Sequence, residues 1–120
     1  MTGDCPFCFP DQGRVFVDTD LYYAIWDGFP VSPGHALIIP KEHLSDWFEA
    51  PNDLQHELIN SIDGVKNAIE RVHRPDGYNV GFNAGIAAGQ TIDHLHIHVI
   101  PRYQGDAPDP RGGVRHVIPS

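Results

Sequence analysis

The chain has 120 residues, of which 41% are hydrophobic and 20% are charged, and its formal net charge is −8. This length and composition predict a single globular domain, residues 1–120, with a core of its own. The acidic balance, without a cluster of Lys and Arg, argues against nucleic-acid binding through backbone phosphates. We find neither an apolar run long enough to cross a bilayer nor a signal peptide, so we expect a cytoplasmic protein without membrane or nucleic-acid partners.

Hydrophobic periodicity and turn residues predict the elements in chain order. Strands are expected at residues 14–18, 21–26, 35–39, 78–83 and 94–100, with a short helical turn at 44–48. Pro51 is expected to open one long helix, which Pro75 and Gly77 end. Its apolar residues recur at three- and four-residue steps: Leu54, Leu58, Ile62, Val65, Ile69 and Val72. This order predicts an α+β fold, a five-stranded antiparallel sheet with one long and one short helix, followed by an extended tail at 104–120.

The two cysteines, Cys5 and Cys8, form a CxxC pair near the start of the chain. A redox pair, half of a metal site and two buried thiols are the three interpretations. A redox pair is expected where a strand leads into a helix, but no periodic segment precedes this one. We favour the metal site, because the chain also holds eight histidines that can supply the remaining ligands.

Three of these histidines, His94, His96 and His98, alternate with apolar residues. On a strand these side chains lie on one face, while Leu95 and Ile97 enter the core on the other. Three imidazoles in such a row indicate a metal site, a phosphate site or a nucleophile. The preceding loop, 83–91, is rich in glycine, which leaves its backbone N–H groups able to face an anion.

Together with the segment from Pro33-Gly34-His35 to His43, these residues resemble the histidine triad (HIT) family of nucleotide hydrolases and transferases. The resemblance runs from Cys5 to about Tyr103. It rests on the triplet itself, on Asn83 and on Gly89-Gln90-Thr91. Residues 105–115 of the tail resemble a bacterial branch of the same family, without a chemistry that we can attach to them.

The resemblance implies an enzyme that cleaves at the α-phosphate of a nucleotide derivative, such as a dinucleoside polyphosphate or a nucleoside phosphoramidate. His96 would be the nucleophile and form a nucleotidyl-histidine, with the His94 carbonyl holding its other ring nitrogen. His98 and His35 would contact the phosphate oxygens and Thr91 the leaving atom. The implied substrate-binding residues are Asp27 at the ribose, Asn83, Gly89 and Gln90 at the phosphate, and Ile25 with Leu21 beside the base.

The resemblance also implies a structural Zn²⁺ bound by Cys5, Cys8, His43 and His94, a set that suits tetrahedral zinc. It implies a homodimer built on the long helix and an edge strand, with Trp47 and Phe48 as candidate contacts. Two alternatives stay open. One is a zinc-dependent hydrolase whose metal is bound by the three triad histidines, and the other is a nucleotide-binding protein with little turnover.

Overall fold

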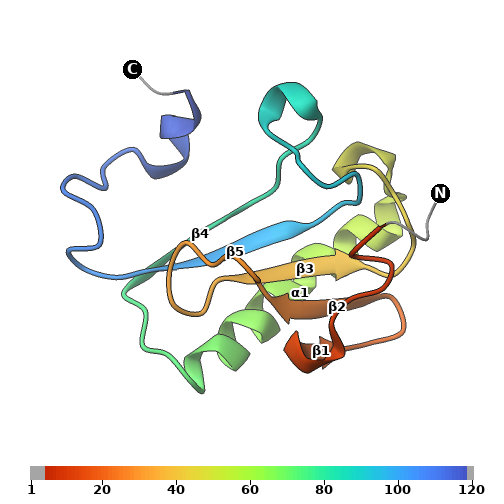
Figure 1. Ribbon diagram of the computed structural model, residues 1–120, viewed down its shortest axis with the longest axis horizontal. Helices are drawn as coiled ribbons and strands as arrows, with labels where there is room; N and C mark the ends of the chain where they lie inside the picture. The colour runs from red at the N-terminus through yellow and green to blue at the C-terminus, as the bar shows by residue number, and fades with distance from the viewer. Residues whose placement is uncertain (1–4, 119–120) are drawn as a thin grey trace.

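The computed structural model describes residues 5–118 and contains one antiparallel sheet with strand order β1-β2-β3-β5-β4. The strands are β1 Val15–Asp18, β2 Tyr22–Trp26, β3 Ala36–Pro40, β4 Gly77–Gly81 and β5 Ile97–Arg102. The long helix α1, Asn52–Glu70, crosses behind this sheet in Figure 1. The described segments also include the short helices η2 Gln12–Arg14, η3 Trp47–Glu49, η4 Ile86–Ala88 and η5 Gly113–Val117. The predicted α+β architecture, with five antiparallel strands and one long helix, is confirmed.

Helix α1 packs on one face of the sheet through the stripe that its sequence predicts. Leu54, Leu58, Val65 and Ile69 are buried against Ala24, Ala36, Ile38, Leu95, Ile97 and Val99 of the sheet side. Ser61 and Ala68 are also buried in the helix, where small side chains allow close approach. The prediction for Val72 is wrong: the helix ends at Glu70 and Val72 is 69% exposed.

The opposite face of the sheet carries a second apolar cluster, made by the alternate residues of the same strands. Tyr23, Ile25, Leu37 and Ile39 form it, and Phe7 from the N-terminal segment covers it. Because side chains alternate along a strand, residues 94, 96 and 98 fall on this second face. We call it the histidine face.

Several element boundaries differ from the sequence prediction. Strand β5 begins at Ile97 instead of His94, because Leu95 N–H donates to Leu44 O at 2.7 Å and leaves the ladder with β3. The short helix is at 47–49 instead of 44–48, and the tail, predicted to be extended, folds into turns and η5. No helix within residues 5–118 is long and apolar enough to cross a membrane.

Candidate active site

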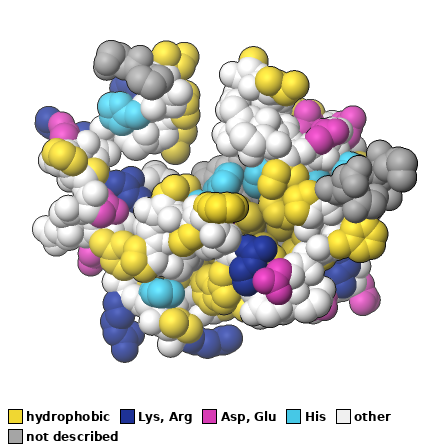
Figure 2. All heavy atoms as spheres, viewed as in Figure 1, with side chains coloured by type: hydrophobic (Ala, Val, Ile, Leu, Met, Phe, Trp, Pro, Cys, Tyr) yellow, Lys and Arg dark blue, Asp and Glu magenta, His cyan; other side chains and the backbone are white. Residues whose placement is uncertain are grey.

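The histidine face places three histidines and one aspartate within a small region at the ends of β2, β3 and β5: His35, His96, His98 and Asp27. Leu37 on β3 pairs with His98 on β5, which brings the preceding His35 beside His98. Asp27 N–H donates to His35 O at 2.9 Å, so the end of β2 joins the same group. Figure 2 shows histidine side chains at the floor of a hollow between the loop that carries η4 and the C-terminal tail.

His96 is held in one tautomer by the backbone. Its Nδ1 lies 2.8 Å from His94 O, and a carbonyl oxygen only accepts, so Nδ1 carries the proton. The Nε2 atom therefore has the lone pair. The ring is 7% exposed and meets the Phe7 ring edge-on, with centroids 5.0 Å apart. Backbone and aromatic contacts thus fix the orientation of this imidazole, and its Nε2 is the atom that can attack an electrophile.

A backbone N–H group determines which ring nitrogen carries the proton in His35 and in His98. Val31 N–H donates to His35 Nδ1 at 3.2 Å, so in neutral His35 the proton is on Nε2. His35 Nε2 is 3.0 Å from His98 Nδ1 and 3.3 Å from Asp27 Oδ2. His98 Nδ1 therefore accepts, and the proton of neutral His98 is on Nε2, where it can be donated to a phosphate oxygen.

Electrostatics keep these two rings neutral near pH 7. Burial, together with the neighbouring His96 and His35, lowers the pKa of His98 to about 4. Burial also lowers the pKa of His35, although the Asp27 carboxylate opposes this shift. Neutral rings fit the hydrogen-bond chain from Val31 to His98, in which each ring accepts at Nδ1 and donates at Nε2.

Gln90 closes the loop that precedes the triad. Its side-chain oxygen accepts from Gly85 N–H at 2.8 Å, and its Nε2 donates to Ser45 O at 2.6 Å and Ile92 O at 3.0 Å. Both amide protons are thereby engaged, so Gln90 shapes the loop and ties it to the segment before η3. The same sequence signal, a glutamine in a Gly-rich loop, predicts a phosphate donor and does not distinguish these two roles.

The other predicted phosphate-binding residues lie in or beside this loop. Gly89 has a φ of 92°, as a left-handed turn needs, but its N–H donates to Ile86 O at 2.9 Å. The loop amides of Gly89 and Gln90 are thus bonded within the loop instead of open to an anion as predicted. Thr91 is exposed and Asn83 is half-buried. Contact of these residues with a substrate stays a prediction.

The two apolar residues predicted to flank a base lie in different places. Ile25 is 1% exposed and belongs to the core beneath the histidine face. Leu21 precedes β2 at the end opposite Asp27, which is six residues or about 20 Å away along an extended chain. Leu21 is therefore placed away from Asp27, while Ile25 lies two residues from it.

Cys5, Cys8, His43 and His94 come together at the other end of the histidine face. Their ligand atoms all lie within 4.8 Å of one another. Cys5 Sγ is 3.3 Å and Cys8 Sγ 3.6 Å from His94 Nδ1, and Cys8 Sγ is 3.1 Å from His43 Nδ1. One tetrahedral zinc holds a sulfur and a nitrogen ligand about 3.6 Å apart, so this donor set fits Zn²⁺.

His94 is prepared as a ligand by its other ring nitrogen. Its Nε2 lies 2.8 Å from Pro40 O, which places the proton there and turns the Nδ1 lone pair toward the two sulfurs. Burial lowers the pKa of His94, which favours the neutral form that binds metal. The alternative site, with one metal on His94, His96 and His98, differs from both groupings of ligand atoms found within residues 5–118; the second grouping is Asp27, His35 and His98.

Sequence reasoning missed two contributors to the site. Phe7 lies inside the CxxC pair and contacts both His94 and His96, with ring centroids 6.0 and 5.0 Å apart. An apolar residue between two expected ligands is a signal that could have pointed to it. Val31 contributes through its backbone N–H alone, and no side-chain pattern indicates such a role.

Comparison with known proteins agrees with this fold. A family model described as the HIT domain matches residues 11–105, and the chain belongs to this family. An uncharacterized HIT-like protein of Methanocaldococcus jannaschii is 40% identical over 108 residues, which are 85% of this chain and 81% of that protein. A solved histidine triad nucleotide-binding protein, described as hypothetical, from Sulfolobus tokodaii superposes with a TM-score of 0.79 at 38% identity, covering 88% of this chain and 73% of that one.

A third similarity is to a longer protein. An AP-4-A phosphorylase of Mycobacterium tuberculosis is 37% identical over 105 residues, covering 87% of this chain. The chain spans 54% of the length of that relative.

Proposed function

We propose that this protein is a hydrolase or transferase that cleaves at the α-phosphate of a nucleotide derivative through a nucleotidyl-His96 intermediate. The observation that carries the proposal is the bond of 2.8 Å from His96 Nδ1 to His94 O, which directs the Nε2 lone pair outward from a fixed ring. A nucleophilic imidazole needs its second nitrogen held in this way.

The proposed reaction has two displacements at phosphorus. In the first, His96 Nε2 forms a bond to the α-phosphorus while the bond to the leaving oxygen or nitrogen breaks, and the leaving group takes the electron pair and, from Thr91 or solvent, a proton. In the second, water or another acceptor attacks the same phosphorus. The phosphorus–nitrogen bond then breaks, neutral His96 is restored and the acceptor's proton is released.

The surrounding residues have electrostatic and binding roles in this proposal. The Nε2–H of His98 donates to a phosphate oxygen as negative charge builds on it, and His35 positions His98 through its own Nε2–H. Asp27 accepts from the ribose hydroxyls and Asn83 contacts the phosphate, while Gly89 and Gln90 hold the shape of the loop beside it. Ile25 supports the base from beneath the histidine face.

A structural Zn²⁺ held by Cys5, Cys8, His43 and His94 completes the proposal. Bound there, the ion would join the N-terminal segment to the end of β3 and to the start of the triad. Thiolate ligands need a reducing compartment, which supports a cytoplasmic location. We also propose a homodimer, in which β4, an edge strand of the sheet, and the neighbouring Phe48 meet a second copy.

The name of the Mycobacterium tuberculosis relative, AP-4-A phosphorylase, supports a nucleotide polyphosphate as the substrate. The test is to trap the intermediate. The protein is incubated with radiolabelled diadenosine tetraphosphate or adenosine 5′-phosphoramidate, quenched in acid-free buffer and digested for mass spectrometry. We expect adenylyl on His96, none in His96→Ala, and unchanged labelling in His56→Ala, which alters an exposed histidine of α1.

Other results would overturn the proposal in distinct ways. Turnover that survives in His96→Ala excludes the covalent mechanism. Turnover that is abolished, beyond a severalfold fall, on removal of zinc while the fold stays intact supports a zinc-dependent hydrolase instead. Tight nucleotide binding with no turnover of either substrate supports a binding protein.

A further inference from the structure

A cavity of about 360 Å³ opens on the histidine face next to His98, and of its lining residues only Val31 is part of the site described above. Its apolar walls are Val31, Pro33, Ile100 and Tyr103, and its polar groups include Asn79 and Arg102. Ile100 is two residues after His98 on β5 and Arg102 four, or roughly 7 and 13 Å along the strand. A ligand that reacts at His96 can therefore extend past His98 into this cavity.

The walls of the cavity belong to the same elements that hold the active site. Tyr103 OH donates to Pro33 O and Ser32 Oγ donates to Pro101 O, both at 2.6 Å. These bonds fasten the segment 31–33 to the end of β5, and the same segment holds His35 through Val31 N–H. The cavity is thus preformed and fixed relative to the reacting histidine.

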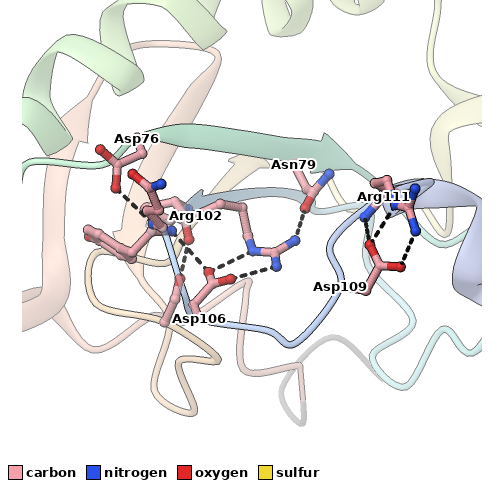
Figure 3. Close-up of polar contacts among 10 residues, drawn as sticks. Asp76, Asn79, Arg102, Asp106, Asp109 and Arg111 are labelled. Carbon is pink, nitrogen blue, oxygen red and sulfur yellow. Dashed lines mark hydrogen bonds and ion pairs between the residues drawn. The ribbon is translucent and has the colours of Figure 1, made fainter.

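The polar groups are arranged as donors. In Figure 3, Arg102 lies between Asn79 and Asp106. The guanidinium donates to Asn79 Oδ1 at 2.7 Å and, through Nε and Nη2, to Asp106 at 2.8 Å each. These bonds use three of its five N–H groups, and they turn the Asn79 Nδ2 amide away from Arg102 toward Gly113 of the tail, with no hydrogen-bond acceptor for its two protons within residues 5–118.

The acidic group in the cavity is neutralised by its partners. Asp106 accepts two bonds from Arg102 and a third from Tyr103 N–H at 3.0 Å. These contacts lower the pKa of Asp106 to about 2, so the pair has no net charge near neutral pH. The remaining N–H donors of Asn79 and Arg102 therefore favour a ligand with acceptor oxygens, such as those of a phosphate.

In the opposite direction along the triad, side chains of the N-terminal segment lie against the histidines. Toward the start of the triad, Phe7 covers His96, and the cluster of Cys5, Cys8 and His43 covers His94. The nucleoside proposed for Asp27 lies on the side of β2 and β3, whereas Asn79 lies on β4, across β5. The two halves of a long substrate would therefore lie on different sides of β5.

Resting on the proposed function, we infer that this cavity binds the leaving half of a dinucleoside polyphosphate. The donors of Asn79 and Arg102 meet the phosphates beyond the scissile bond, and the leaving nucleoside lies against Val31, Pro33 and Tyr103. A pocket of this size, apolar with a few fixed polar groups, is typical of small-molecule sites. The small leaving group of a nucleoside phosphoramidate would not reach this cavity.

The test measures binding without chemistry, in the His96→Ala background, by isothermal titration calorimetry. We expect diadenosine tetraphosphate to bind at least about tenfold more tightly than AMP. Adding Ile100→Trp, which fills the cavity from β5, or Asn79→Ala should remove that difference and leave the affinity for AMP unchanged. Asn67→Ala, at an exposed asparagine of α1, is the matched control and should keep the difference.

Each result decides the inference. Equal affinity for the two ligands overturns it, as does a difference that persists in both cavity variants. Ile100→Trp covers the case in which Asn79→Ala loosens Arg102 and the tail, because it fills the cavity and leaves the hydrogen bonds of Arg102 in place. Failure to trap adenylyl-His96 in the wild type would instead overturn the proposed function, which this binding measurement does not test.

Discussion

The Nδ1 atom of His96 lies 2.8 Å from the main-chain oxygen of His94. His94 also turns its own Nδ1 toward Cys5 Sγ at 3.3 Å and its Nε2 toward Pro40 O at 2.8 Å. A single residue therefore belongs to the candidate zinc site by its side chain and to the candidate nucleophile by its backbone. A change that moves the His94 ring is expected to reach the reactive nitrogen two residues later.

Cys5→Ser tests this connection. The hydroxyl is a poor ligand for zinc, so we expect loss of bound metal and a lower free energy of unfolding, by about 3 kcal/mol or more. Because the His94 carbonyl then has more freedom, kcat should fall severalfold even where the protein remains folded. Metal analysis, urea denaturation and steady-state kinetics on one preparation measure all three. A Cys5→Ser protein with wild-type stability and metal content would contradict the assignment.

Gln90→Ala tests the loop before the triad. The variant removes three hydrogen bonds, to Gly85, Ser45 and Ile92, each with a net value of about 1 kcal/mol. We expect faster hydrogen exchange across residues 84–92 and a loss of about tenfold in kcat/KM. Gln104→Ala, at an exposed glutamine whose side chain makes no hydrogen bond among the described residues, is the control.

Gln90→Glu distinguishes the hydrogen bond that the Gln90 side chain accepts from the two that it donates. It keeps an acceptor for Gly85 N–H but places a carboxylate against the carbonyl oxygens of Ser45 and Ile92. We therefore expect it to be at least as harmful as Gln90→Ala. Wild-type exchange in both variants would show that another contact closes the loop.

Local patterns predicted which side chains share a face, because alternation and helical periodicity depend on neighbours in sequence. Leu95, Ile97 and Val99 enter the core beside α1, and His94, His96 and His98 lie on the other face. The metal-binding set was not available from spacing, since its members are 3, 35 and 51 residues apart in order. The family resemblance supplied it, and the fold brings the four residues together.

Single hydrogen bonds of the backbone and one ion pair account for the parts that sequence reasoning did not predict. The N–H of Leu95 donates to Leu44 O and delays the start of β5, and Val31 N–H sets the tautomer of His35. The tail is similar: its ion pair between Arg102 and Asp106 orders a segment that looks aperiodic in sequence. Such bonds involve the backbone or one long side chain, so they leave no periodic signal.

Gly34→Ala is expected to destabilise the protein, because Gly34 has a φ of +85° and precedes His35. A methyl group there would lie 2.8 Å from His73 Cδ2 and 3.3 Å from Ile69 Cγ2. The left-handed backbone costs about 1–2 kcal/mol for a residue with a side chain, and displacement of His73 adds to it. Gly64→Ala in α1 meets nothing within 4 Å and should instead stabilise by about 0.5–1 kcal/mol. Urea denaturation compares the pair, and equal effects of the same sign would contradict the conformation at Gly34.

Mild acid should destabilise the protein through His98. Its pKa is about 4 in the folded protein, against an ordinary value of 6.5 that applies on unfolding. Between these values the unfolded chain binds a proton that folded His98 does not, so stability falls as pH decreases from about 6.5 to 4. His98→Asn should make this dependence shallower, leaving the part that comes from the lowered pKa values of His35 and His94, whereas His56→Asn, at an exposed position of α1, should keep the wild-type slope. The measurement is the slope of unfolding free energy against pH for the three proteins. An unchanged slope in His98→Asn would place the proton uptake on another group.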